Sequence, residues 1–138
     1  MAYWLFKTEA ETFSWKMQKS RGAKGEPWSG VRNFAAAKNM KAMKKGDLGF
    51  FYHTGDEKQI VGIVEVIGEY RPDPTDETAK FGLVDVKAVA DLPKPVTLAQ
   101  AKADPKLAKM TLVTFSRLSV QPVTDAEWKH VCKLGGLK

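Results

Sequence analysis

The sequence contains a single cysteine, Cys132, among its 138 residues, and only two histidines, His53 and His130. One cysteine cannot form an internal disulfide, and two histidines far apart in the chain provide no compact set of zinc ligands. We therefore expect no metal and no cofactor. Cysteine usage of this kind suits a reducing compartment, so the expected location is cytoplasmic, or nuclear if the source is eukaryotic.

Long apolar segments are also missing. The uncharged apolar stretches are a few residues long, far below the ~20 residues that a membrane helix requires. The apolar start of the chain ends at Lys7 and lacks the basic first region of a signal peptide. Hydrophobic residues make up 43% and charged residues 28% of the chain, as in globular proteins. We expect one soluble, monomeric domain that spans residues 1–138 and does not bind membranes.

Common catalytic signatures are absent. The sequence has no Gly-x-x-x-x-Gly-Lys-Ser/Thr phosphate loop, no Gly-x-Gly-x-x-Gly and no His-Glu-x-x-His. Cys132 occupies the apolar face of a predicted helix, where a small buried hydrophobe is more common than a nucleophile. These absences favour a protein that is not an enzyme.

Positive charge is concentrated in one part of the chain. The net charge is +6, and residues 16–45 contain nine basic side chains but only one acidic side chain, Glu26, for a local balance of +8. Such a cluster is typical of nucleic-acid binding, but also of a solvated lysine-rich face. Lysines outnumber arginines 18 to 4, which favours attraction to phosphates over bidentate reading of guanine. Lys38, Lys41 and Lys45 share the outer face of a predicted helix and are candidates to face phosphates.

Apolar periodicity predicts an α+β fold. The expected helices cover residues 12–19, 33–45, 97–103 and a final segment that begins at Thr124, where Glu127 completes a capping box. The expected strands cover residues 2–9, 47–54, 59–70, 81–89 and 112–120, with a hairpin turn at 55–58. Because no strand–helix–strand alternation occurs, we expect a mostly antiparallel, curled sheet of five or six strands with helices at its ends.

Two segments carry unusual residues. Trp28 lies between Pro27 and Ser29–Gly30 in the loop 20–32, so its ring either stacks on a planar ligand or covers one end of the core. Arg32 can pair with a phosphate, and Asn33 either caps the following helix or reads a base. The strand end Tyr52–His53 brings a hydroxyl and an imidazole to a possible cavity mouth.

Seven ordered motifs are spread along the chain: Tyr3–Glu9, Phe13–Trp15, Trp28–Asn33, Met43–Asp47, Phe51–His53, Ile60–Ile63 and Arg117–Val123. Together they resemble the motifs of the EVE domain, a member of the PUA-like superfamily. The match runs almost from end to end, with departures at Thr8 and Ala10, where serine and proline are usual, and a shorter region at 76–80. This resemblance implies a PUA-like, curled β-barrel of five or six, mostly antiparallel strands.

The resemblance also implies a non-catalytic reader of a modified base in nucleic acid. The expected base is 5-methylcytosine or 5-hydroxymethylcytosine in DNA, turned out into an aromatic pocket. Carried over by position, Trp28 is a pocket wall, and the remaining contacts follow from the motifs. Lys7, Thr8 and Ser29 surround the base edge or its phosphate; Asn33, Tyr52 and His53 are polar contacts; Arg32 and Arg117 contact the backbone. Strand alternation places Lys7 and Glu9 on one face and Thr8 on the other, so we expect that not all three reach one pocket without a bulge.

Two other functions remain open at this point. PUA-like folds also include ASCH-type domains, some of which resemble small amidohydrolases that use a lysine, a threonine and a glutamate to act on modified nucleosides. Lys7, Thr8, Glu9 and Glu65 supply these residue types here. A desolvated lysine with a lowered pKa can activate a threonine hydroxyl. A protein-interaction module that uses the Trp28 loop is the third interpretation, and it predicts no salt-dependent binding to nucleic acid.

Overall fold

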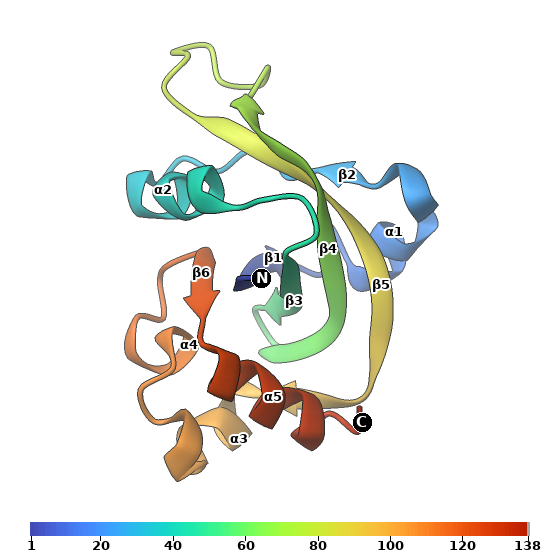
Figure 1. Ribbon diagram of the computed structural model, residues 1–138, viewed down its shortest axis with the longest axis vertical. Helices are drawn as coiled ribbons and strands as arrows, with labels where there is room; N and C mark the ends of the chain where they lie inside the picture. The colour runs from blue at the N-terminus through green and yellow to red at the C-terminus, as the bar shows by residue number, and fades with distance from the viewer. Residues whose placement is uncertain (138) are drawn as a thin grey trace.

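The computed structural model describes residues 1–137 and contains one mixed six-stranded sheet with flanking helices (Figure 1). β1 pairs with β3 in parallel, and every other strand pair of the sheet is antiparallel. The spatial order is β2-β5-β4-β3-β1-β6. The strands are β1 (Tyr3–Glu9), β2 (Glu26–Pro27), β3 (Leu48–Thr54), β4 (Gln59–Pro72), β5 (Gly82–Thr97) and β6 (Val120–Val123).

The sheet curls but stays open between its edge strands β2 and β6. β4 and β5 are long, at 14 and 16 residues, and their pairing shifts register at four points. Register shifts of this type bend a strand and increase its twist. The predicted α+β class and the curled, mostly antiparallel sheet are confirmed, and the expected barrel is an open one.

Helices lie at both ends of the sheet. In Figure 1, α2 lies beside β4 and β5 at one end, whereas α3, α4 and α5 gather at the other. No helix within residues 1–137 has the length and apolar character needed to cross a bilayer. The helices are α1 (Trp15–Ser20), η1 (Gly22–Lys24), α2 (Phe34–Ala42), α3 (Leu98–Ala103), η2 (Pro105–Leu107), α4 (Thr111–Thr114) and α5 (Asp125–Leu134).

The core consists of two apolar clusters, one on each face of the sheet. Along β1 the side chains alternate, so that Phe6 belongs to the first cluster and Leu5 to the second. The first cluster also contains Trp15 and Trp28, and the second contains Trp128 from α5. The first cluster supports the functional site described below.

Two strand predictions are corrected. Residues 112–120 do not form a strand: α4 takes up the first part, and β6 begins only at Val120. β5 does not end at residue 89 but continues past Pro93 and Pro95 to Thr97. Its pairing with β4 jumps from Asp91 to Val96, so both prolines lie in a bulged stretch where no backbone donor is needed.

The predicted helix caps are partly confirmed. The Asn33 side chain accepts a hydrogen bond from the backbone N–H of Ala36 at 2.9 Å, and Thr124 caps α5 with a complete capping box. α1 begins at Trp15, later than the predicted residue 12, and Ser14 is its cap. α2 ends at Ala42, so Lys45 lies in the following turn and not on the helix face shared by Lys38 and Lys41.

Candidate functional site

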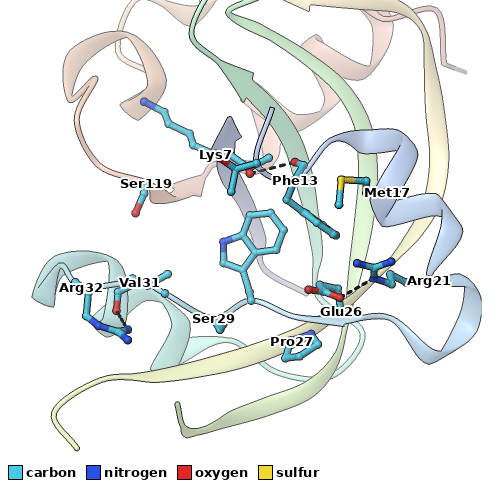
Figure 2. Close-up of a pocket in the computed structure, with 14 residues that line it drawn as sticks. Lys7, Phe13, Met17, Arg21, Glu26, Pro27, Ser29, Val31, Arg32 and Ser119 are labelled. Carbon is cyan, nitrogen blue, oxygen red and sulfur yellow. Dashed lines mark hydrogen bonds and ion pairs between the residues drawn. The ribbon is translucent and has the colours of Figure 1, made fainter. Parts of the chain in front are cut away.

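A cavity of about 500 Å³ opens between the end of β1, helix α1 and the segment 26–32. Figure 2 shows Lys7 and Ser119 on one side of it and Phe13, Met17 and Arg21 on the other. A second hollow of similar volume adjoins it and shares Lys7, Thr8 and Ser119. Of the predicted site residues, the cavity is lined by Lys7, Thr8, Trp28, Ser29 and Arg32; Arg117 lines the adjoining hollow.

Trp28 forms an aromatic wall of this cavity and belongs to the core as well. Its side chain is only 7% exposed, and its ring packs edge-on against Phe6 and Phe51, with centroid separations of 5.2 and 5.7 Å. Phe13, another lining residue, lies 6.1 Å from the same ring. The backbone N–H of Trp28 donates to the carbonyl of Val84 at 2.8 Å. Trp28 is therefore a rigidly held core residue whose ring also lines the cavity, and its stacking on a ligand stays a prediction.

The loop that carries Trp28 is anchored by Asp73, which lies beyond the end of β4 and is 2% exposed. Its carboxylate accepts hydrogen bonds from the backbone N–H of Gly30 at 2.8 Å and from Arg32 at 3.2 Å, and it also accepts from Thr75. Burial raises the pKa of Asp73, but the bonds from Thr75, Gly30 and Arg32 outweigh it and hold the pKa below its ordinary value. A buried carboxylate thus fixes both the loop and Arg32.

Cationic groups surround the cavity. Lys7 is half-buried, its ammonium donates to the carbonyl of Ser116, and it lies 5.6 Å from the Tyr52 ring centroid. Desolvation by burial lowers the pKa of Lys7. Arg21 pairs with Glu26 at 2.9 Å and lies over the ring of Phe13 at 5.5 Å. Anions and electron-rich ring edges are attracted to such a rim.

Hydroxyl groups supply the neutral polar part of the lining. Thr12, Ser29 and Ser119 each contribute one, and a hydroxyl both donates and accepts. Thr8 donates its hydroxyl to the carbonyl of Phe13 at 3.1 Å and retains acceptor capacity. Lys7 and Thr8 line the cavity, whereas Glu9 does not. All three line the adjoining hollow at the end of β1, contrary to the expectation from strand alternation.

Three predicted contacts lie outside the cavity lining. His53 is buried: its Nε2 accepts the backbone N–H of Trp15 at 2.9 Å, and its Nδ1 donates to Glu57 at 3.0 Å. The bond from His53 lowers the pKa of Glu57. Tyr52 is 3% exposed in the second core cluster, and burial raises its pKa. Asn33 caps α2 with its side-chain oxygen. His53 and Tyr52 lie in β3 and Asn33 lies at the start of α2, and these places account for the contacts of all three side chains without a ligand.

The candidate phosphate-facing lysines, Lys38, Lys41 and Lys45, are all exposed. Lys38 and Lys41 lie three residues apart on α2, on one face of the helix. The ammonium group of Lys41 lies 5.5 Å from the ring centroid of Tyr70 on β4. Lys45 follows the helix, and its backbone N–H donates to Glu69 at 3.4 Å.

Of the four residues of the amidohydrolase alternative, Lys7, Thr8 and Glu9 line the adjoining hollow together, but Glu65 lies apart from them. Leu48 pairs with both Tyr3 and Glu65, whereas Lys7 pairs with Tyr52. The four residue steps from Tyr3 to Lys7 span about 13 Å along the strand at ~3.3 Å per residue. Glu65 instead lies 3.9 Å from Lys87. Within residues 1–137, no three His, Cys, Asp or Glu side chains are grouped as metal ligands.

Sequence reasoning missed several lining residues, notably Phe13, Arg21 and Ser119, and the anchor Asp73. Phe13 and Ser119 lie within motifs that carried the family resemblance, so that signal was available. The sequence held no such signal for Asp73, because an aspartate between two prolines is typical of any turn. Only the tertiary fold brings it to Gly30, 43 residues earlier in the chain.

Comparisons with known proteins agree with this architecture. Residues 2–134 match the EVE domain family. Human thymocyte nuclear protein 1 is 30% identical, and the alignment covers 96% of this chain and 73% of the human protein. A crystal structure of an Agrobacterium tumefaciens protein superposes with a TM-score of 0.95 at 53% identity, covering 99% of this chain and 94% of the other.

Human THYN1 in complex with DNA that contains 5-methylcytosine has a TM-score of 0.91 at 29% identity, covering 100% of this chain and 99% of the other. The fold thus defines a PUA-like domain with an open, curled sheet and a loop-walled cavity. More narrowly, the chain belongs to the EVE domain family, as its motifs predict.

Proposed function

We propose that this protein binds nucleic acid and reads a modified base, 5-methylcytosine or 5-hydroxymethylcytosine in DNA, inside the cavity walled by Trp28. The observation that carries the proposal is the combination of a rigid aromatic wall with a cationic rim in one cavity of about 500 Å³. That volume falls within the roughly 300–1,000 Å³ typical of small-ligand sites. The human relative with DNA containing 5-methylcytosine supports the same assignment.

The lining suits a base that has left its stack. Stacking lost in the duplex is replaced by contact with aromatic rings, here those of Trp28 and Phe13. Val31 and Met17 add apolar surface of the kind that contacts a pyrimidine methyl group. Hydroxyls of Ser29 and Ser119 can donate to and accept from the polar edge of the base.

Charges at the edge of the cavity and beyond it suit the phosphate backbone. Arg32 is fixed by Asp73 and Thr75 at the cavity edge, and Arg117 lies beside the adjoining hollow. Lys38 and Lys41 extend the positive surface along α2. Contacts of this kind position a nucleic acid without reading its sequence, so the cavity carries the specificity.

A binding panel tests the proposal. Matched oligonucleotides, DNA and RNA, carry cytosine, 5-methylcytosine, 5-hydroxymethylcytosine, adenine or N6-methyladenine at one position, and fluorescence anisotropy gives each affinity at several salt concentrations. We expect a preference for a 5-modified cytosine in DNA that persists as salt weakens all complexes. Equal affinity for all bases contradicts base reading, and salt-independent binding or none contradicts nucleic-acid binding.

A further inference from the structure

Phe34, which is exposed, and Phe81, which is half-buried, form an aromatic pair near the cavity. Phe34 is the first residue of α2 and is 68% exposed. Its ring centroid lies 4.8 Å from that of Phe81, which directly precedes β5, and the two planes meet at 32°. The contact with Phe81 therefore leaves most of the Phe34 side chain in water, and such exposed apolar surface is typical of binding sites when polar groups surround it.

Arg32 connects this pair to the cavity. It lines the cavity, and its guanidinium carbon lies 5.9 Å from the ring centroid of Phe81. Hydrogen bonds to Asp73 at 3.2 Å and to Thr75 at 3.0 Å hold the guanidinium in place. The aromatic pair and the cavity thus share one fixed cation at their common border.

The position of Phe81 is fixed by the turn that precedes it. Asp76 accepts hydrogen bonds from the backbone N–H of Phe81 at 2.7 Å and of Lys80 at 2.9 Å. The same carboxylate also accepts from the backbone and the hydroxyl of Thr78. This closed turn holds the ring beside Phe34 before any ligand arrives, which lowers the entropy lost on binding.

Basic residues continue from Phe34 along one face of α2. Phe34, Lys38 and Lys41 occupy positions i, i+4 and i+7, which lie on the same side of a helix, and all three are exposed. An exposed aromatic ring in line with two ammonium groups matches a base followed by its phosphates. A protein partner would require a broader apolar surface than this single pair.

We infer that the Phe34–Phe81 pair is a stacking surface for the nucleotide next to the base held in the cavity. This inference rests on the proposed function and extends it to a second subsite. Aromatic stacking accepts any base, so the pair contributes affinity for a strand without contributing to the choice of modified base. The cavity and the pair then have separable effects on binding.

Phe34→Ala tests this division. The ring is exposed and alanine favours the helix, so the fold is retained. Affinity for a single-stranded DNA with one central 5-methylcytosine should fall about 5- to 150-fold, the range for one stacked base. The ratio of affinities for 5-methylcytosine and cytosine should not change. Val89→Ala, which trims another exposed apolar side chain at 50% exposure, is the matched control and should leave affinity unchanged.

A second ligand series shows where the ring acts. Replacing the nucleotide on the 5′ or the 3′ side of the modified base with an abasic site should weaken wild-type binding on one of the two sides. In Phe34→Ala the same replacement should have no further effect, since the partner of the lost base is already gone. Suppose that the wild-type protein prefers the modified base, but Phe34→Ala has no effect on affinity, or its effect adds to that of the abasic site. Either result overturns this inference and leaves the proposed function standing. Wild-type protein without any preference contradicts the proposed function instead.

Discussion

The carboxylate of Asp73 accepts a hydrogen bond from the backbone N–H of Gly30 at 2.8 Å, although 43 residues separate the two in sequence. Gly30 has φ +83°, a conformation that favours glycine, and it follows directly after the segment that carries Trp28. Through this bond the turn beyond β4 holds the wall of the cavity. The shape of the site therefore depends on a buried side chain that does not line it.

Replacing Asp73 with asparagine should destabilise the protein and loosen the loop. One carboxylate oxygen accepts from Gly30 and Arg32 and the other from Thr75. Asn keeps only one acceptor oxygen, so its amide nitrogen cannot accept one of these two sets of bonds. Hydrogen bonds to charged groups contribute about 1.5–3 kcal/mol, and we expect the free energy of unfolding in urea to fall by that amount. Asp56→Asn, at an exposed turn, is the control and should have little effect. Equal stability of both variants would show that Asp73 does not anchor the loop.

Trp28 should contribute to base preference and to stability together. Cutting a buried tryptophan to alanine typically destabilises a protein by about 3–5 kcal/mol, so binding must be measured well below the melting temperature. Under that condition Trp28→Ala should weaken binding of the preferred oligonucleotide about 5- to 150-fold while the salt-dependent background remains.

Trp15 offers a matched control, because it is also 7% exposed and lies in the same core cluster, but it does not line the cavity. Trp28→Phe and Trp15→Phe should both lower thermal stability, and only Trp28→Phe should reduce the preference for the modified base. A loss of preference in both variants would mean that the effect is one of stability alone.

Lys38, Lys41 and Lys45, changed together to glutamine, should weaken binding to every oligonucleotide by a similar factor. Each lost phosphate contact lowers the slope of log affinity against log salt by roughly 0.7 to 0.9. The control replaces Lys102, Lys106 and Lys109, exposed residues in and near α3 and η2, with glutamine. This control has the same change in net charge, so an equal change of slope in both triple variants would indicate that Lys38, Lys41 and Lys45 form a solvated face that does not contact phosphates.

Stability should depend on pH through Asp76. Hydrogen bonds from Thr78, Phe81 and Lys80 lower the pKa of Asp76 to about 2, against an ordinary value of 3.8, despite partial desolvation. A depressed pKa means that the stabilisation is present above the unfolded-state value and is lost as pH falls through the folded-state value. The difference in stability between wild type and Asp76→Asn should therefore be constant above about pH 5 and shrink towards pH 2. A difference that does not shrink would contradict the turn described here.

The sequence predicted the fold well where a helix or strand is determined by the side chains of its own residues. The caps at Asn33 and Thr124 and the strands 3–9 and 48–54 follow from side-chain type and alternation. It failed at residues 112–120, where an apolar run has the length of a strand but forms a helical turn and a loop. Pro93 wrongly predicted a strand end, because a bulge that tolerates proline depends on the neighbouring strand and not on the local sequence.

The site was predicted less completely than the fold. The unusual loop tryptophan Trp28 and the strand end at Lys7 and Thr8 do meet at one cavity. His53 does not reach this cavity. An imidazole at a strand end has the same sequence signature whether it binds a ligand or, as here, accepts a hydrogen bond from the backbone N–H of Trp15. Contacts such as Asp73 to Gly30 join distant segments, and a single sequence does not specify them.

Filling the cavity tests the central claim most directly. Ser119 lines the cavity, and Ser119→Phe would occupy the space that the base requires, while Ser20→Phe places the same ring on α1 outside the lining. The measurement is the ratio of affinities for DNA with and without the 5-modified cytosine, in wild type and in both variants, by fluorescence anisotropy. The account predicts that Ser119→Phe abolishes the preference but keeps the salt-dependent binding, and that Ser20→Phe keeps both. An unchanged preference in folded Ser119→Phe would show that the base is read elsewhere.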